Sequence, residues 1–233
     1  MARSPVSRPR ARCHKPKGQL NQDYKQFLGL RDEDIQKIYE QLLSQTGSVI
    51  NNQQPATNNQ QQLEEDDLSS EKGVNYAKLR DLLQAGKWKE ADYETYLVML
   101  HAVGREENDW IRNEELLKFP SKDLRTINTL WVKYSDGKFG FSVQKEIYLI
   151  VGAEADGKYY EEAWIKLAEK VGWKINDSWI ICEEVTYGNS APIGHLPFWS
   201  SKVGIRERDS MRGVFWVGVM FSSLVSRLVR VSI

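Results

Sequence analysis

Residues 121–144 read SKDLRTINTLWVKYSDGKFGFSVQ, and this stretch decides the fold. Its apolar residues recur at helical spacing, and they are Leu124, Ile127, Leu130, Trp131 and Tyr134. This spacing predicts an amphipathic helix with one broad apolar face. Ser121 is expected to cap the N-terminus, and Asp123 to complement the helix dipole in the first turn. The sequence Ser-Asp-Gly at 135–137 predicts the end of the helix.

The opposite face of this helix is expected to be polar and solvated. It carries Lys122, Arg125, Asn128, Thr129 and Lys133. Immediately after the helix, Gly140 lies between Phe139 and Phe141, and a residue without a side chain allows the backbone to approach something flat or bulky. Periodicity alone favours a plain core helix.

Further apolar stripes predict an all-α domain. One helix is expected from Tyr76 to Gly86, a second from Trp88 to Gly104, and a short helix or charged loop over residues 105–120. Helical spacing continues over residues 143–150 and again over 164–171, where Gly172 suits the C′ position of a helix end. Residues 214–233 predict a docked terminal helix. Only residues 179–185 are compatible with a short strand.

Composition excludes several classes of protein. The 233 residues carry a formal net charge of zero, so no general attraction to nucleic acid or anionic membrane is implied. The only two cysteines, Cys13 and Cys182, lie far apart, which leaves no disulfide framework or metal-ligand spacing and fits a reducing compartment. The longest apolar run, residues 213–225, is shorter than the roughly 20 residues of a membrane span. We therefore expect a soluble protein.

The N-terminal third is expected to be organised separately from the core. Residues 1–18 are basic and interrupted by prolines, which predicts a disordered tail, although a transit-like leader or a mis-assigned start also fits. Residues 19–47 contain one short amphipathic helix around 32–43, suited to docking or dimerisation. Residues 48–72 are a polar, low-complexity linker, predicted to be disordered. The main domain is then expected to span residues 73–233.

No catalytic constellation is present. The three histidines are His14, His101 and His195. His195 lies in a tight segment and is expected to form structural hydrogen bonds, with general-base or axial-ligand roles as alternatives. The pairs Glu161-Glu162 and Glu183-Glu184 are expected to be solvated. The residues do not suggest an enzyme.

A different combination points to ligand binding. All eight tryptophans lie from Trp88 onward, and four cations cluster at residues 202–212. A large flat apolar ligand with peripheral carboxylates requires apolar walls, aromatic faces and Arg or Lys side chains. The alternative is that the aromatic residues form the core and the cations a solvated rim.

Three segments carry a family resemblance: NYAKLRDLLQAGKWKEAD at 75–92, EELLKFPSKDLRTINTLWVKYSDGKFGFSVQ at 114–144, and SAPIGHLP at 190–197. Together they closely resemble the tetrapyrrole-binding regulators of magnesium chelatase, the "genomes uncoupled" accessory proteins of cyanobacteria and plastids. The resemblance runs from about Gly73 to the end of the chain. It implies an all-α porphyrin-binding fold that binds protoporphyrin IX or magnesium protoporphyrin IX, without catalysis. It further implies a magnesium chelatase regulator that stimulates magnesium insertion in chlorophyll biosynthesis and takes part in porphyrin signalling.

The resemblance also implies a site. One side is formed by residues 110–113, including Trp110 and Asn113, and Leu124 and Ile127 form the surface beneath the ligand. The other side comprises Tyr187, Phe198, Trp199, Arg206 and Arg212, with Arg206 or Arg212 pairing the propionates. A loop tryptophan of well-known members is missing here, with Cys182 or a neighbour in its place.

Partners and location follow from the same resemblance. The large subunit of magnesium chelatase is the implied protein partner, and no nucleic acid is implied. The cytoplasm of a cyanobacterium or the plastid stroma is the implied location, with possible peripheral contact to the thylakoid membrane. The alternative function is a protein-interaction or stress-signalling module on the same fold, with weak or no porphyrin binding. Peripheral membrane attachment through residues 213–231 is a third reading.

Overall fold

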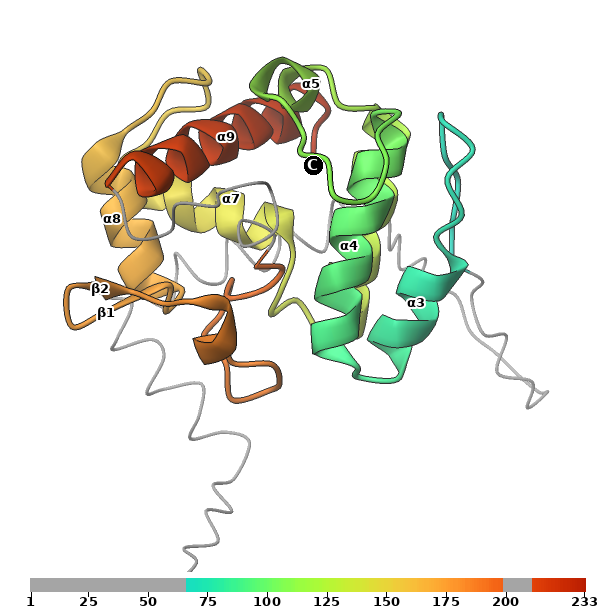
Figure 1. Ribbon diagram of the computed structural model, residues 1–233, viewed down its shortest axis with the longest axis horizontal. Helices are drawn as coiled ribbons and strands as arrows, with labels where there is room; N and C mark the ends of the chain where they lie inside the picture. Colours follow the sequence, from blue (N-terminus) through green and yellow to red (C-terminus); the bar gives the residue numbers. More distant parts are fainter. Residues whose placement is uncertain (1–65, 199–210) are drawn as a thin grey trace, which may run out of the picture. The chain divides into compact units, whose positions relative to one another are not determined.

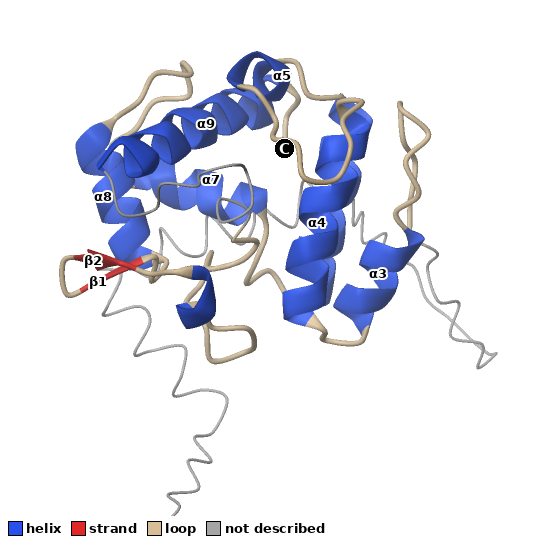
Figure 2. Cartoon of the chain, viewed as in Figure 1, coloured by secondary structure: helices blue, strands red, loops and turns tan. Residues whose placement is uncertain are grey.

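The structure, a computed structural model, describes residues 66–198 and 211–233, with side chains in the last segment from residue 214 onward. Within these residues it contains seven α-helices, one small antiparallel hairpin and a single 3₁₀ turn (Figures 1 and 2). The helices are α3 (Ala77–Gln84), α4 (Trp88–Ala102), α5 (Asn113–Leu117), α6 (Ser121–Tyr134), α7 (Phe141–Ile150), α8 (Glu161–Lys170) and α9 (Met211–Arg230). The predicted all-α fold is confirmed. The predicted N-terminal tail, short helix and most of the linker lie outside the described residues.

Helix α6 forms the centre of one half of the core, in contact with α3, α4 and α7. The apolar stripe is buried as predicted, with Tyr134 half-buried at its end. The Trp131 ring stacks on Trp88 with centroids 6.1 Å apart, and its Nε1–H donates a 2.9 Å hydrogen bond to Thr95 Oγ1 of α4. This pairing fixes α4 against α6.

Two details of α6 differ from the prediction. Pro120 occupies the N-cap position, and Ser121 is the first helical residue, whose hydroxyl donates a 2.6 Å hydrogen bond to Glu71. Asn128 is buried on the face that was expected to be polar, because its Oδ1 accepts a 2.8 Å hydrogen bond from the Ser142 N–H at the start of α7. A satisfied amide is stable in the core, and spacing alone cannot distinguish it from a solvated one.

The chain preceding α3 docks along α6. The Asp123 carboxylate has no exposed surface and accepts hydrogen bonds from Ser70 Oγ (2.5 Å), the Glu71 N–H (2.8 Å) and the Tyr76 hydroxyl (2.8 Å). Burial, together with this carboxylate, raises the pKa of Tyr76. Asp66 accepts a further bond of 2.7 Å from Lys133. Residues 66–72 are thus part of the folded domain, and the predicted linker extends too far at its C-terminal end.

The second half of the core forms where α9 crosses α7 and α8 and reaches α5 (Figure 1). Phe221 of α9 packs edge-on against Tyr148 of α7, with centroids 5.3 Å apart, and lies 5.5 Å from Trp164 of α8. The predicted docking of the terminal helix is confirmed. Trp173 and Trp179 extend this aromatic cluster, with ring centroids 5.9 and 5.8 Å from that of Trp164.

The end of α8 also follows the sequence. Gly172 has φ +73°, its N–H bonds to the Glu169 carbonyl (3.3 Å), and the Trp173 N–H bonds to the Ala168 carbonyl (2.7 Å). This pair of bonds is the Schellman arrangement that favours glycine at C′.

The segment after α8 contains the main error of the sequence analysis. The predicted strand over residues 179–185 is wrong for most of its length. Strand β2 (Ser178–Trp179) pairs with β1 (Lys174–Ile175), and residues Cys182–Glu184 form the 3₁₀ turn η1. Asn176 and Asp177 connect the strands with φ values of +49° and +63°, the conformation of a tight hairpin turn.

Candidate ligand-binding site

The two most distinctive sequence segments, FGFSVQ and SAPIGHLP, bind each other. The Gly140 N–H donates to the Leu196 carbonyl (3.0 Å), and the Gly194 N–H to the Lys138 carbonyl (2.9 Å). The fully buried Gln144 side chain completes the junction, since its Nε2 donates to the carbonyls of Gly194 (2.9 Å) and Pro197 (3.0 Å). The junction thus fixes the backbone of residues 194–197, immediately before the described range ends at residue 198.

His195 has a structural role, as predicted. Its Nδ1 lies 2.6 Å from the Val171 carbonyl, and its Nε2 accepts a 3.1 Å hydrogen bond from the Thr186 N–H. Burial lowers the pKa of His195, which favours the neutral ring with the proton on Nδ1. Both ring nitrogens are therefore engaged in hydrogen bonds. Without rearrangement, neither nitrogen is available for proton transfer or for an axial bond to a metal.

Helix α4 anchors the segment that carries two of the predicted ligand residues, here called the Tyr187 segment (residues 185–198). The buried Asp92 carboxylate of α4 accepts a 2.6 Å hydrogen bond from the Phe198 N–H. The Tyr187 hydroxyl lies 3.4 Å from its second oxygen. Burial and the Asp92 charge raise the pKa of Tyr187, so the phenol stays a neutral donor. Asp92 thus connects both ends of the segment to one helix.

The same helix anchors the loop on the other side, here called the Trp110 loop (residues 103–112). Tyr93 and Tyr96 of α4 stack with centroids 6.1 Å apart. The Tyr93 hydroxyl donates to the Glu107 carboxylate, and the Tyr96 hydroxyl donates a 3.0 Å bond to the Asp109 carbonyl. About one turn of α4 therefore positions both chain segments that the resemblance assigns to the ligand.

Sequence reasoning missed Asp92. The available signal was its position: it lies four residues after Trp88 and four before Tyr96, on the face of the predicted helix that those aromatic residues bury. A carboxylate on a buried face requires a partner. That requirement could have suggested Asp92 as an anchor.

The predicted site residues occupy different environments. Trp110 is 49% exposed, Tyr187 is half-buried, and Phe198 is buried with its ring edge-on to Trp173 at 5.7 Å. Asn113 begins α5, and its buried Oδ1 has no hydrogen-bond partner among the described residues. These four residues stay predictions as ligand contacts.

The predicted surface beneath the ligand is closed. Leu124 and Ile127 have no exposed surface and belong to the core between α6 and its neighbours. Contact with a ligand would require the side chains that cover them to move aside. Trp199 and Arg206 lie outside the described residues. Arg212 falls in the first turn of α9, and its side chain is likewise outside the described part.

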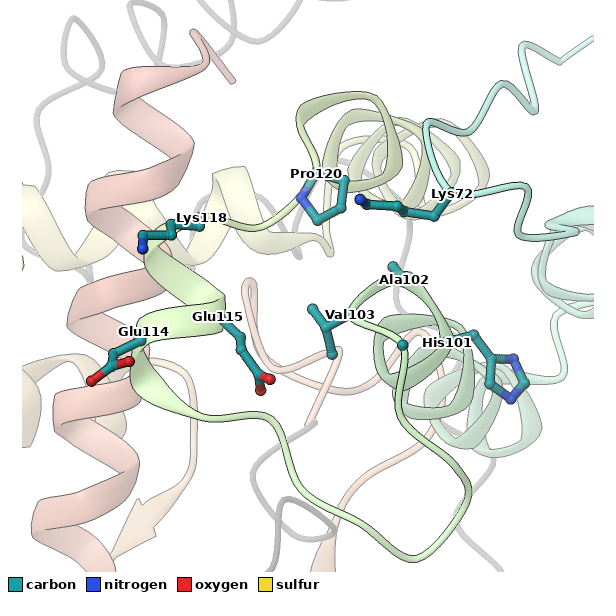
Figure 3. Close-up of a pocket in the computed structure, with 9 residues that line it drawn as sticks. Lys72, His101, Ala102, Val103, Glu114, Glu115, Lys118 and Pro120 are labelled. Atoms are coloured by element: carbon teal, nitrogen blue, oxygen red, sulfur yellow. The ribbon is translucent and has the colours of Figure 1, made fainter.

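Two surface hollows of the described part lie beside the anchored segments. One of about 720 Å³ lies beside α3, α4 and the Tyr187 segment, where Leu82, Tyr93, Cys182 and Tyr187 contribute to its walls. The other, of about 510 Å³, lies between the C-terminal end of α4 and α5 (Figure 3). In Figure 3, Val103 and Glu115 face this second hollow, whereas His101 points away from it. The first hollow is the one that adjoins a predicted ligand residue.

Other classes of site have no support in the described residues. Within the ranges 66–198 and 211–233, no group of three or more His, Cys, Asp or Glu side chains is arranged to bind a metal. In the same ranges, every helix is too short or too polar to cross a bilayer.

The described residues thus form a small, mostly helical domain in which two chain segments are anchored on one helix. A GUN4-like family model matches residues 69–213, which is more than half of the chain. The chain therefore belongs to the GUN4-like family.

Relatives come from cyanobacteria and plastids. A Ycf53-like protein of Synechocystis is 36% identical over 147 residues, covering 62% of this chain and 59% of the relative. A ycf53 protein of Pyropia yezoensis, described as uncharacterized, is 33% identical over 144 residues and is covered over 56% of its length. The tetrapyrrole-binding protein of Arabidopsis thaliana chloroplasts is 26% identical over 132 residues, or 50% of this chain and 45% of the relative. The chain thus spans between 45% and 59% of the length of these three relatives.

Solved structures are also similar. The GUN4 structure from Chlamydomonas reinhardtii is 28% identical, with a TM-score of 0.49 over 66% of this chain and 94% of that one. The ligand-free Arabidopsis GUN4 is 24% identical, with a TM-score of 0.49 over 65% and 94%.

Proposed function

We propose that this protein is a non-catalytic tetrapyrrole-binding regulator that binds protoporphyrin IX or magnesium protoporphyrin IX and stimulates magnesium chelatase. Membership of the GUN4-like family and a relative named for tetrapyrrole binding support this proposal. The observation that carries it is the shared anchoring of the Trp110 loop and the Tyr187 segment on α4. Two segments fixed to one helix require little ordering when a rigid ligand binds, which favours affinity.

The proposed site is the one that the family resemblance implies. In it, Trp110 and Asn113 would contact the ligand from one side and Tyr187, Phe198 and Trp199 from the other, with Arg206 or Arg212 pairing the propionates. Leu124 and Ile127 contact the ligand only when the residues that cover them move. The ring is bound mainly by apolar area and stacking, since each buried aromatic contact contributes favourably.

A porphyrin titration tests the proposal. Deuteroporphyrin IX is added to the full chain while its absorption band and the tryptophan emission are recorded. We expect saturable binding at micromolar concentration or tighter, weakened about tenfold by Trp110→Ala because one stacking contact is lost. The matched control is Ile175→Ala, which truncates an equally exposed apolar residue of the hairpin. Folded protein that does not bind overturns the proposal and favours the protein-interaction or stress-signalling alternative.

The proposed domain organisation assigns partner contacts to the short helix around residues 32–43, within the N-terminal residues 1–65. Residues 66–72 dock on α6, so a deletion should end at residue 65 to leave that contact intact. The deleted chain is expected to bind porphyrin normally and to stimulate magnesium insertion less if the N-terminal segment contacts the chelatase. We propose a location in cyanobacterial cytoplasm or plastid stroma, since the relatives come from these sources. Flotation with liposomes tests peripheral membrane contact.

A further inference from the structure

The Trp110 loop and the start of α5 carry two arginines in opposite situations. The Arg105 guanidinium donates from Nε and Nη2 to Glu115 (2.9 and 2.6 Å) and from Nη1 to Asp109 (2.6 Å). Its side chain is 19% exposed. All three guanidinium nitrogens of Arg105 therefore bond within the protein, and this side chain links the loop to α5.

Arg112 is different. Its side chain is 43% exposed, and its only carboxylate contact within residues 66–198 and 211–233 is a long one of 3.7 Å to Asp109. One Nη1–H donates a 3.3 Å hydrogen bond to the Trp110 carbonyl. The guanidinium carbon lies 4.9 Å from the centre of the Trp110 ring. Among the described residues nothing else bonds to this guanidinium, so most of its donors remain available.

The backbone presents Trp110 and Arg112 on the same side. Arg112 is extended (φ −87°, ψ 154°), and the intervening Ile111 is buried. In an extended segment, residues two apart project from the same face. The Trp110 N–H donates to Asp109 Oδ1 (2.8 Å) and the Arg112 N–H to Glu115 Oε2 (2.7 Å), so both backbone positions are fixed.

We propose that Trp110 and Arg112 form a binding site for a flat aromatic acid, in which the indole stacks on the ring and Arg112 pairs a peripheral carboxylate. A guanidinium matches a carboxylate with two parallel hydrogen bonds. Stacking on the indole pre-orients it, so less side-chain freedom is lost on binding. The weak 3.7 Å contact with Asp109 is exchanged for the stronger one. This inference rests on the proposed function and assigns one carboxylate of the ligand to Arg112, apart from the cations at residues 202–212.

The test compares a free acid with its ester. The full chain is titrated with deuteroporphyrin IX and with its dimethyl ester, which has the same ring without ionised carboxylates, and binding is followed by the porphyrin absorption band. We expect Arg112→Ala to weaken the binding of the free acid about tenfold and to leave the binding of the ester unchanged. Arg112→Lys should recover part of the loss, since it restores charge without the planar fork. The control Arg80→Ala removes an equal charge from a half-buried site on α3, where Arg80 pairs with Asp81, and should change the binding of neither ligand.

The outcomes separate the two proposals. If Arg112→Ala weakens the binding of acid and ester equally, or of neither, the proposed carboxylate site is overturned. The proposal of porphyrin binding then still stands. A wild-type chain that binds neither ligand overturns the proposed function and this inference with it. Circular dichroism of each variant confirms that folding is intact, as expected for an exposed side chain.

Discussion

Gly218 of α9 lies directly against the ring of Tyr159. A Cβ atom at residue 218 would come within 2.3 Å of the ring Cε2 and 2.8 Å of Cδ2. Tyr159 in turn packs edge-on against Phe215, with centroids 4.9 Å apart. The absence of a side chain at 218 is therefore what allows the chain before α8 to pack on α9.

Substitution of this glycine should destabilise the fold. Gly218→Ala gains about 1 kcal/mol of helix propensity, but the displaced ring costs about 1–3 kcal/mol of packing. We expect a net loss of up to about 2 kcal/mol in the free energy of unfolding, measured with urea. In a Tyr159→Ser background the clash is absent, so Gly218→Ala should no longer destabilise the protein relative to Tyr159→Ser alone; an equal loss in both backgrounds would contradict the steric explanation.

Gln144 predicts a pH effect of distinctive sign. Gln144→Glu places a carboxylate against the carbonyls of Gly194 and Pro197, so we expect a loss of about 3 kcal/mol near pH 7. Burial and the facing carbonyl oxygens raise the pKa of the new carboxyl in the folded state above its unfolded value. Stability relative to the wild type is thus recovered as pH falls from 7 towards 5. Gln144→Leu, which cannot ionise, should lose about 2 kcal/mol at every pH.

His195 predicts the opposite slope. Burial lowers the pKa of His195 in the folded state below that of the unfolded chain, so the unfolded state takes up a proton first as pH falls. The stabilisation is complete above the unfolded pKa of about 6.5 and is lost as pH falls through the folded value. Urea unfolding at pH 7.5, 6.5 and 5.5 measures this slope. His195→Gln should flatten it, whereas His101→Gln, on the exposed face of α4, should leave it unchanged.

Asp92 should affect stability and porphyrin affinity together. Asp92→Ala leaves the buried Phe198 N–H without this acceptor, and we expect a loss of about 1–3 kcal/mol in the free energy of unfolding. Asp92→Asn keeps an acceptor oxygen and should lose less. Since the anchored Tyr187 segment belongs to the proposed site, deuteroporphyrin binding should weaken in the same order. Affinity that is unchanged in Asp92→Ala would show that anchoring of this segment does not contribute to binding.

Much of the helical core could be predicted from spacing. The stripe from Leu124 to Tyr134 and the glycine after α8 each follow from local rules, because periodicity and left-handed backbone conformation are properties of short segments. The hairpin at residues 174–179 was also within reach. Asn176-Asp177 is a residue pair that tolerates a tight turn, and the apolar residues that follow it hid this signal.

The polar anchors could not be predicted in the same way. Asn128, Asp123 and Gln144 are stable in the core only because partners 14 to about 50 residues away complete their hydrogen bonds. A single sequence contains the donors and acceptors but not their pairing. The same holds for the site residues that the family resemblance implies, since their surroundings could not be predicted from a single sequence either. Leu124 and Ile127 are apolar in either case, and only the surrounding chain determines whether they line an opening or fill the core.

Helix α4 couples two chain segments mechanically. Asp92, Tyr93 and Tyr96 span about 6 Å of one rigid helix, so a small rotation of α4 would move the Trp110 loop and the Tyr187 segment in concert. Substitutions at the core contacts of α4, such as Thr95 against Trp131, are therefore expected to displace both segments from a distance.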